Sequence, residues 1–160
     1  MLRDVLALNE AAYGDAHEKP ANTLQNLGRL VGSQGRIEEA EALHWRAYRA
    51  YQVALPEGHF QTAFPLLSLA DYALDRGDAA TAERLARQAR QILDAGLPEG
   101  HWIAAYAGGL VGRARAMRGD VAEARPLLRR SCEALREVTS EAKRAVVYCS
   151  ALADLTGPGL

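Results

Sequence analysis

The sequence predicts an all-α fold, a solenoid of antiparallel helical hairpins, from three observations. A 42-residue period runs along the chain, apolar residues follow a helical spacing on both sides of one glycine in each period, and small residues recur in phase. Three positions hold the same residue in all three periods: Gly35, Gly77 and Gly119; Ala40, Ala82 and Ala124; and Leu43, Leu85 and Leu127. A fixed period of this length is typical of stacked repeats. One hairpin cannot bury both its faces, so neighbouring hairpins must pack together.

We expect a single domain over residues 1–160, divided by this period. Residues 2–13 are predicted to form a helix that matches the second helix of a repeat, without a first helix before it. Three complete repeats are expected at 19–53, 60–95 and 102–137, and a closing first helix without a partner at 139–155. Two interpretations of these half-repeats stay open: the chain is cut from a longer array, or the outer helices serve as caps.

Each repeat carries signals for a tight turn between its two helices. The recurring glycine is expected to end the first helix in a left-handed conformation. Asp78 and Asp120 then stand where an N-cap residue begins the second helix. Pro65 is expected to start, bend or loosen the first turn of its helix. Small residues mark the helix crossings, at Gly28, Ala70 and Gly112 in the first helices and at the recurring alanine in the second.

These positions resemble the tetratricopeptide repeat family. Its pattern, large–large–small in the first helix and small–small in the second, is matched by Leu24, Leu27, Gly28, Ala40 and Ala47. The 42-residue length is similar to the kinesin-light-chain type of this repeat, which also occurs in bacterial signalling proteins. The resemblance covers residues 2–155. It implies a right-handed superhelix, first helices that line a concave groove, and a protein or peptide partner in that groove.

The net charge and the distribution of apolar residues argue against several classes of function. The formal net charge of −1 gives no field that favours nucleic acid or an anionic membrane. No apolar run is long enough to span a bilayer, and the N-terminus lacks the pattern of a secretory signal, so we expect a cytoplasmic protein. Cys132 and Cys149 lie in different predicted helices, and reduced thiols are the expectation for such a protein.

Three histidines recur in phase, one in each loop before a first helix: His17, His59 and His101. Copies one repeat apart are too distant to share one metal ion, because packed helix axes lie about 8–10 Å apart. We therefore expect loop packing and capping rather than metal binding. The chain also shows no phosphate-binding loop and no catalytic triad or carboxylate pair, so we expect no cofactor, no metal and no enzymatic activity.

The groove that the resemblance implies supplies the candidate binding residues: Asn26, Arg29, Phe64, Ser68, Asp71, Tyr106, Leu110, Arg113 and Tyr148. Arg29, Asp71 and Arg113 share one phase and form a ladder of alternating charge. Two interpretations of this ladder stay open, inter-repeat ion pairing and recognition of a bound segment. The arginines on the later second helices are expected to form a solvated outer surface, with a patch for an acidic partner as the alternative.

The preferred function is therefore a protein-interaction module that binds a partner peptide or helix in its groove. The alternative is a structural spacer or self-association segment of a larger signalling protein such as a kinase, with homo-oligomers formed through the chain ends. One recognition mode of the family is not matched. At the five positions where chaperone-binding members clamp a C-terminal carboxylate with Lys, Asn and Arg, this chain has Gln25, Arg29, Ser68, Tyr106 and Leu110.

Overall fold

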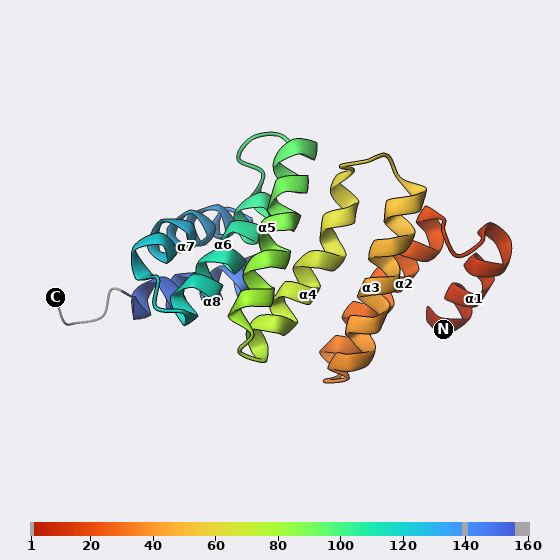
Figure 1. Cartoon of the computed structure of the whole chain (residues 1–160), viewed down its shortest axis with the longest axis horizontal. Helices are drawn as coiled ribbons and strands as arrows, with labels where there is room; N and C mark the ends of the chain where they lie inside the picture. Colours follow the sequence, from red (N-terminus) through yellow and green to blue (C-terminus); the bar gives the residue numbers. More distant parts are fainter. Residues whose placement is uncertain (1, 139–140, 156–160) are drawn as a thin grey trace.

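A computed structural model describes residues 2–138 and 141–155. The described residues form helices and connecting turns without a strand, and the helical hairpins follow one another along the molecule from α1 at one end to α6 and α7 at the other, with α8 beside them (Figure 1). They are α1 (Leu2–Tyr13), α2 (Glu18–Ser33), α3 (Ile37–Ala54), a 3₁₀ turn η1 (Phe60–Thr62), α4 (Ala63–Asp75), α5 (Ala79–Gly96), α6 (Trp102–Met117), α7 (Val121–Arg136) and α8 (Ala142–Asp154). The all-α solenoid predicted from the 42-residue period is confirmed.

The helices pair as the period predicts. Helices α2 and α3, α4 and α5, and α6 and α7 pack closely as consecutive hairpins, and α8 packs on α7. The recurring alanines at 40, 82 and 124 are fully buried. Gly112 lies where α6 meets α7, and a Cβ atom there would approach Leu128 Cγ to 3.0 Å and the Ala124 carbonyl oxygen to 3.2 Å. The small residues therefore set how closely the helices of a hairpin approach.

The turns inside the hairpins also follow the sequence signals. Gly35, Gly77 and Gly119 have φ angles of 78°, 80° and 86°, the left-handed conformation that a side chain disfavours. Asp78 caps α5, because its carboxylate accepts a hydrogen bond from the Thr81 N–H at 3.0 Å. Asp120 occupies the same position before α7 but makes no capping hydrogen bond. Its carboxylate instead lies 3.9 Å from the Arg118 guanidinium.

Proline shapes the entry into the second hairpin. The segment before Pro65 begins as the 3₁₀ turn η1 and becomes α-helical at Ala63, so Pro65 lies in the first turn of α4. Proline tolerates this position because the first turn of a helix has no partner for its backbone N–H groups. The expectation that Pro65 alters the start of its helix agrees with this geometry.

The state of the two cysteines differs from the one expected from the sequence. Reduced thiols were expected, but Cys132 of α7 and Cys149 of α8 form a disulfide, with their Cα atoms 5.0 Å apart. The pairing arises because α8 folds back along α7 after a short connection, which places residues 17 apart in the sequence side by side. No helix in the described part of the chain is both long and apolar enough to cross a membrane.

Candidate functional site

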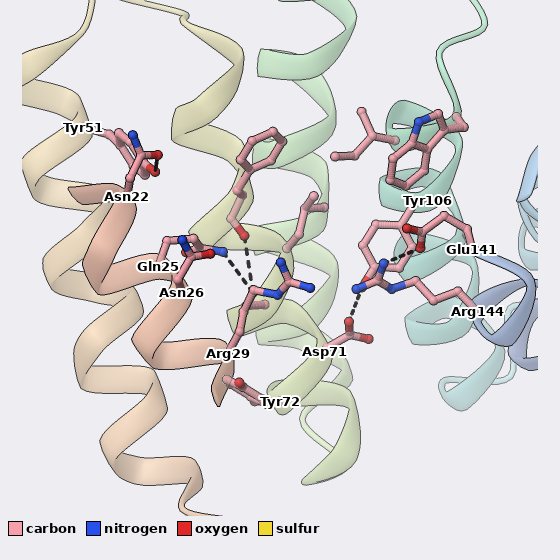
Figure 2. Close-up of a pocket in the computed structure, with 15 residues that line it drawn as sticks. Asn22, Gln25, Asn26, Arg29, Tyr51, Asp71, Tyr72, Tyr106, Glu141 and Arg144 are labelled. Carbon is pink, nitrogen blue, oxygen red and sulfur yellow. Dashed lines mark hydrogen bonds and ion pairs between the residues drawn. The ribbon is translucent and has the colours of Figure 1, made fainter. Parts of the chain in front are cut away.

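An inner groove of about 520 Å³ runs across the first helices α2, α4 and α6 (Figure 2). Side chains from α3 and from the start of α8 complete it. Its lining comprises Asn22, Gln25, Asn26, Arg29, Tyr51, Phe64, Leu67, Ser68, Asp71, Tyr72, Trp102, Ile103, Tyr106, Glu141 and Arg144. We refer to this surface as the inner groove.

The α2 wall of the inner groove combines fixed and free polar groups. Asn22 Oδ1 accepts a hydrogen bond from the Tyr51 hydroxyl at 2.6 Å, and Gln25 Oε1 lies 2.8 Å from Nδ1 of buried His44. These amides are therefore held by the protein itself. Asn26 and Arg29 are exposed, and no described residue forms a hydrogen bond or ion pair with either side chain. The Arg29 guanidinium consequently offers a positive charge without a counter-charge.

At the centre of the inner groove, the carboxyl group of Asp71 is paired with neighbouring side chains. The Tyr106 hydroxyl donates a hydrogen bond to Asp71 Oδ2, and Arg113 Nη1 lies 3.4 Å from Asp71 Oδ1. Burial raises the pKa of the Asp71 carboxyl above its usual value, although the bond from Tyr106 and the charge of Arg113 oppose this shift. The predicted ladder thus divides in two. Asp71 and Arg113 form the inter-repeat ion pair, whereas Arg29 stays outside it.

Apolar side chains form the opposite part of the inner groove. Phe64 on α4 is half-buried and meets Phe60 edge to face, with the ring centroids 5.8 Å apart. Trp102 and Ile103, in the first turn of α6, are also half-buried and line the same surface. A partner side chain placed here would remove apolar area from water, which is the main favourable term in association.

The C-terminal end of the inner groove is built by α8 and the residue before it. Glu141 and Arg144 form an ion pair, and Figure 2 shows the two side chains together beside Tyr106. The Arg144 guanidinium lies 5.0 Å from the centroid of the Tyr106 ring, a cation–π contact. Because Tyr106 also bonds to Asp71, α8 is connected through one side chain to the centre of the inner groove.

The structure brings most of the predicted site residues together, but not all. Asn26, Arg29, Phe64, Ser68, Asp71 and Tyr106 line the inner groove. Arg113 lies beside it, as the ion-pair partner of Asp71. Leu110 and Tyr148 are instead fully buried, so neither presents a surface to a partner. Tyr148 packs under the inner groove, edge to face with Tyr106 at 5.9 Å between ring centroids.

Several groove residues were missed by the sequence analysis: Trp102, Ile103, Glu141 and Arg144. A signal for two of them was present. Trp102 follows Phe60 by one 42-residue period, and Arg144 follows Trp102 by one more. The predicted site residues lie mainly in the middle of the first helices, whereas these four side chains lie at the helix starts.

The phased histidines act as caps, which confirms the structural role expected for them. His17 Nδ1 accepts a hydrogen bond from the Lys19 N–H at 3.2 Å, and His101 Nδ1 accepts one from the Ile103 N–H at 3.2 Å. His59 does the same for η1 at 3.3 Å. Each imidazole also stacks on a neighbouring aromatic ring, at Tyr13, Phe60 and Trp102.

Part of the outer surface is paired internally, around one buried carboxylate. Glu83 on α5 is buried, and its carboxylate forms ion pairs with Arg87 at 2.7 Å and with Arg115 and Arg118 at 3.0 Å each. Burial acts to raise the pKa of Glu83, but the Arg115 hydrogen bond and the neighbouring guanidinium charges outweigh it, so the pKa is lowered. These three arginines therefore have an internal counter-charge that Arg29 lacks.

Comparison with known families agrees with this architecture. Family models described as tetratricopeptide repeat match residues 1–52, 63–88 and 105–130. A search of curated proteins found no match to the sequence. The matched segments cover more than half of the chain and coincide with its helical hairpins, and the chain therefore belongs to the tetratricopeptide repeat family.

Proposed function

We propose that this chain is a non-catalytic protein-interaction module that binds a peptide or helix of a partner in its inner groove. The observation that carries the proposal is the state of the Arg29 guanidinium. It is exposed in the groove and has no counter-charge among the described residues, whereas Asp71 and Glu141 are both paired. Arg29 is thus the charged side chain of the inner groove that can still pair with an acidic group of a partner.

The partner segment is expected to place an acidic group at Arg29 and an apolar side chain near Phe64 and Trp102. Guanidinium and carboxylate form paired hydrogen bonds, and they are strongest where water is excluded. Asn26, which has no partner among the described residues either, lies one helical turn from Arg29 and can bond to the backbone of the segment. The net charge of −1 supports a protein partner rather than a nucleic acid or a membrane.

Charge reversal at Arg29 tests the proposal. Arg29→Glu is expected to reduce capture of the partner from a lysate of the source cell by about 10-fold or more, since a groove anchor contributes about 2 kcal/mol. Arg129→Glu is the matched control, because Arg129 is exposed on α7 and makes the same charge change. Bound proteins are quantified by mass spectrometry, and circular dichroism checks that both variants are folded. Loss of capture with Arg129→Glu, together with retention by Arg29→Glu, would place the site on the outer surface instead.

A second candidate function is a spacer or self-association segment of a larger signalling protein. Apolar side chains on the two outermost helices favour it, because Leu8 on α1 is 69% exposed and Val146 on α8 is 63% exposed. Val5 on α1 and Val147 on α8 are exposed as well, and contiguous exposed apolar surface occurs at sites where proteins associate. The molar mass in solution separates the two functions. A monomer that captures a partner supports the groove, and a dimer dispersed by Leu8→Lys or Val146→Lys supports self-association.

A further inference from the structure

The disulfide between Cys132 and Cys149 links the last described helix to the body of the solenoid. We propose that this pair is a thiol–disulfide switch that fixes α8 against α7 and so sets the shape of the C-terminal end of the inner groove. The part of the proposal that concerns α8 is argued from the disulfide and the packing of α8, without reference to a partner. The effect of the switch on a partner rests on the function proposed above.

Noncovalent contacts hold α8 less firmly than they hold its neighbour. Of the α8 side chains only Ala145 and Tyr148 are buried, whereas α7 buries five residues. Val146 and Val147, on the same helix, are exposed. Besides the disulfide, the Leu155 carbonyl accepts a hydrogen bond from Arg125 Nη2 at 2.8 Å. The remaining apolar contacts of this segment, from Cys149, Ala151, Leu152 and Leu155, are only partly buried against the core, so a covalent link between α7 and α8 strengthens a packing that is weaker than that of the inner hairpins.

The position of α8 matters to the inner groove because α8 supplies part of its wall. Arg144 lines the groove and covers the Tyr106 ring, and Tyr148 packs beneath Tyr106. Tyr106 in turn donates its hydroxyl hydrogen bond to Asp71. If α8 leaves α7, the Tyr106 ring loses both contacts, and the groove loses the Arg144 wall. The redox state of two cysteines outside the groove is thereby coupled to its shape.

A reductant can reach the bond from one side. Cys132 is buried, but Cys149 is half-buried and lines a surface hollow together with Arg136. A thiolate of a dithiol attacks Cys149 Sγ, and the Cys132 sulfur leaves as a thiolate. The second thiol of the reductant then displaces Cys149 from the mixed disulfide. The protein gains two electrons and two protons, and the reductant becomes a disulfide. In a reducing compartment Cys132 and Cys149 rest as two thiols. Exchange with a small-molecule disulfide, which takes up the two electrons and two protons and becomes two thiols, forms the bond and locks α8.

Hydrogen exchange of the full chain tests this switch without any partner. The chain is equilibrated in oxidised or in reduced dithiothreitol, its free thiols are counted by mass spectrometry, and amide exchange is followed by peptide. We expect reduction to speed exchange in residues 142–154 by about 10-fold or more, as local opening becomes easier. Peptides that contain Trp102 and Tyr106 should also exchange faster, whereas α2 and α3 serve as an internal reference and should not change.

Variants separate the bond from other effects of the reductant. Cys132→Ser/Cys149→Ser should exchange like the reduced wild-type chain under both conditions. The proposal is overturned if no disulfide forms, or if it forms without slowing exchange in α8. Faster exchange in α8 with no change around Tyr106 overturns the coupling to the groove. None of these outcomes depends on partner capture, so a failure of the switch is distinguishable from a failure of the proposed function.

Discussion

The chain should lose about 3 kcal/mol of stability between pH 6.5 and pH 4 through one buried side chain, that of His44. Its imidazole is fully buried between α2 and α4. Nδ1 lies 2.8 Å from Gln25 Oε1, to which it donates as N–H, while Nε2 has no partner among the described residues. Protonation would place a second buried N–H at Nε2 without an acceptor. Burial first, and the nearby charge of Arg29 second, lower the pKa of His44 to about 4.

The direction of the effect follows from linkage. Above pH 6.5 the imidazole is neutral in both states and contributes no pH dependence. As the pH falls below 6.5 the unfolded chain binds a proton that the folded chain excludes until about pH 4. At 1.36 kcal/mol for each pH unit of this window, the loss amounts to about 3 kcal/mol. Urea unfolding at several pH values between 7.5 and 4 measures it.

His44→Asn is the matched variant, because its amide can still donate to Gln25 but does not titrate. We expect it to be less stable than the wild type at pH 7.5, owing to the smaller side chain, and to lose less stability on acidification. The carboxylates of the chain, that of Glu83 among them, make both proteins sensitive to acid, and their contributions cancel when the two pH profiles are compared. Parallel pH profiles for the two proteins would show that His44 is protonated in the folded state or not buried.

A second large effect should come from Gly109→Ala on α6. A Cβ atom at this position would collide with Ser131 Oγ and lie 2.6 Å from Tyr148 Cε1. Both side chains are fully buried, and Ser131 Oγ is held by its hydrogen bond to the Ala105 carbonyl. Neither can move without disturbing α7 or α8. We expect destabilisation of about 1–3 kcal/mol, the usual range for an overpacked core, read from the midpoint of urea unfolding.

Gly108→Ala, one residue earlier, is the control and should have the opposite sign. Its Cβ atom would meet only the end of the flexible Arg90 side chain, at 3.4 Å. Alanine in place of glycine inside a helix then stabilises by about 0.5–1 kcal/mol. Equal destabilisation by both substitutions would mean that the face of α6 turned toward α8 is assigned wrongly.

The sequence was sufficient for the fold because the period leaves few alternatives. Gly77 and Ala82 recur at fixed distances from their copies, and only stacked hairpins place each copy in an equivalent environment. Glycine turns and capping residues mark the ends of the described helices locally, whereas residues 139–140, where the closing helix is expected to begin, lie outside the described residues. The kinesin-light-chain type of the repeat and the right hand of the superhelix stay predictions.

Details that depend on a single contact between two helices could not be predicted from the sequence. Asp120 looks like Asp78 in the sequence, but it interacts with Arg118 rather than with its own helix. Nothing in the sequence around Cys132 and Cys149 indicates that α8 folds back along α7 so that the two sulfur atoms meet. Tyr148 has the phase of a groove residue, yet Gly109 leaves a space that its ring fills. Each of these outcomes is decided by a neighbour on another helix.

The central claim, that a partner segment lies in the inner groove, is tested most directly by site-specific photocrosslinking. Benzoylphenylalanine is placed at Asn26, an exposed groove residue on α2, and in a separate protein at Arg129, on the outer surface of α7. After illumination in the source cell, the account predicts a covalent adduct of defined mass from position 26 and none of that mass from position 129. An adduct from position 129 with none from position 26 would contradict it.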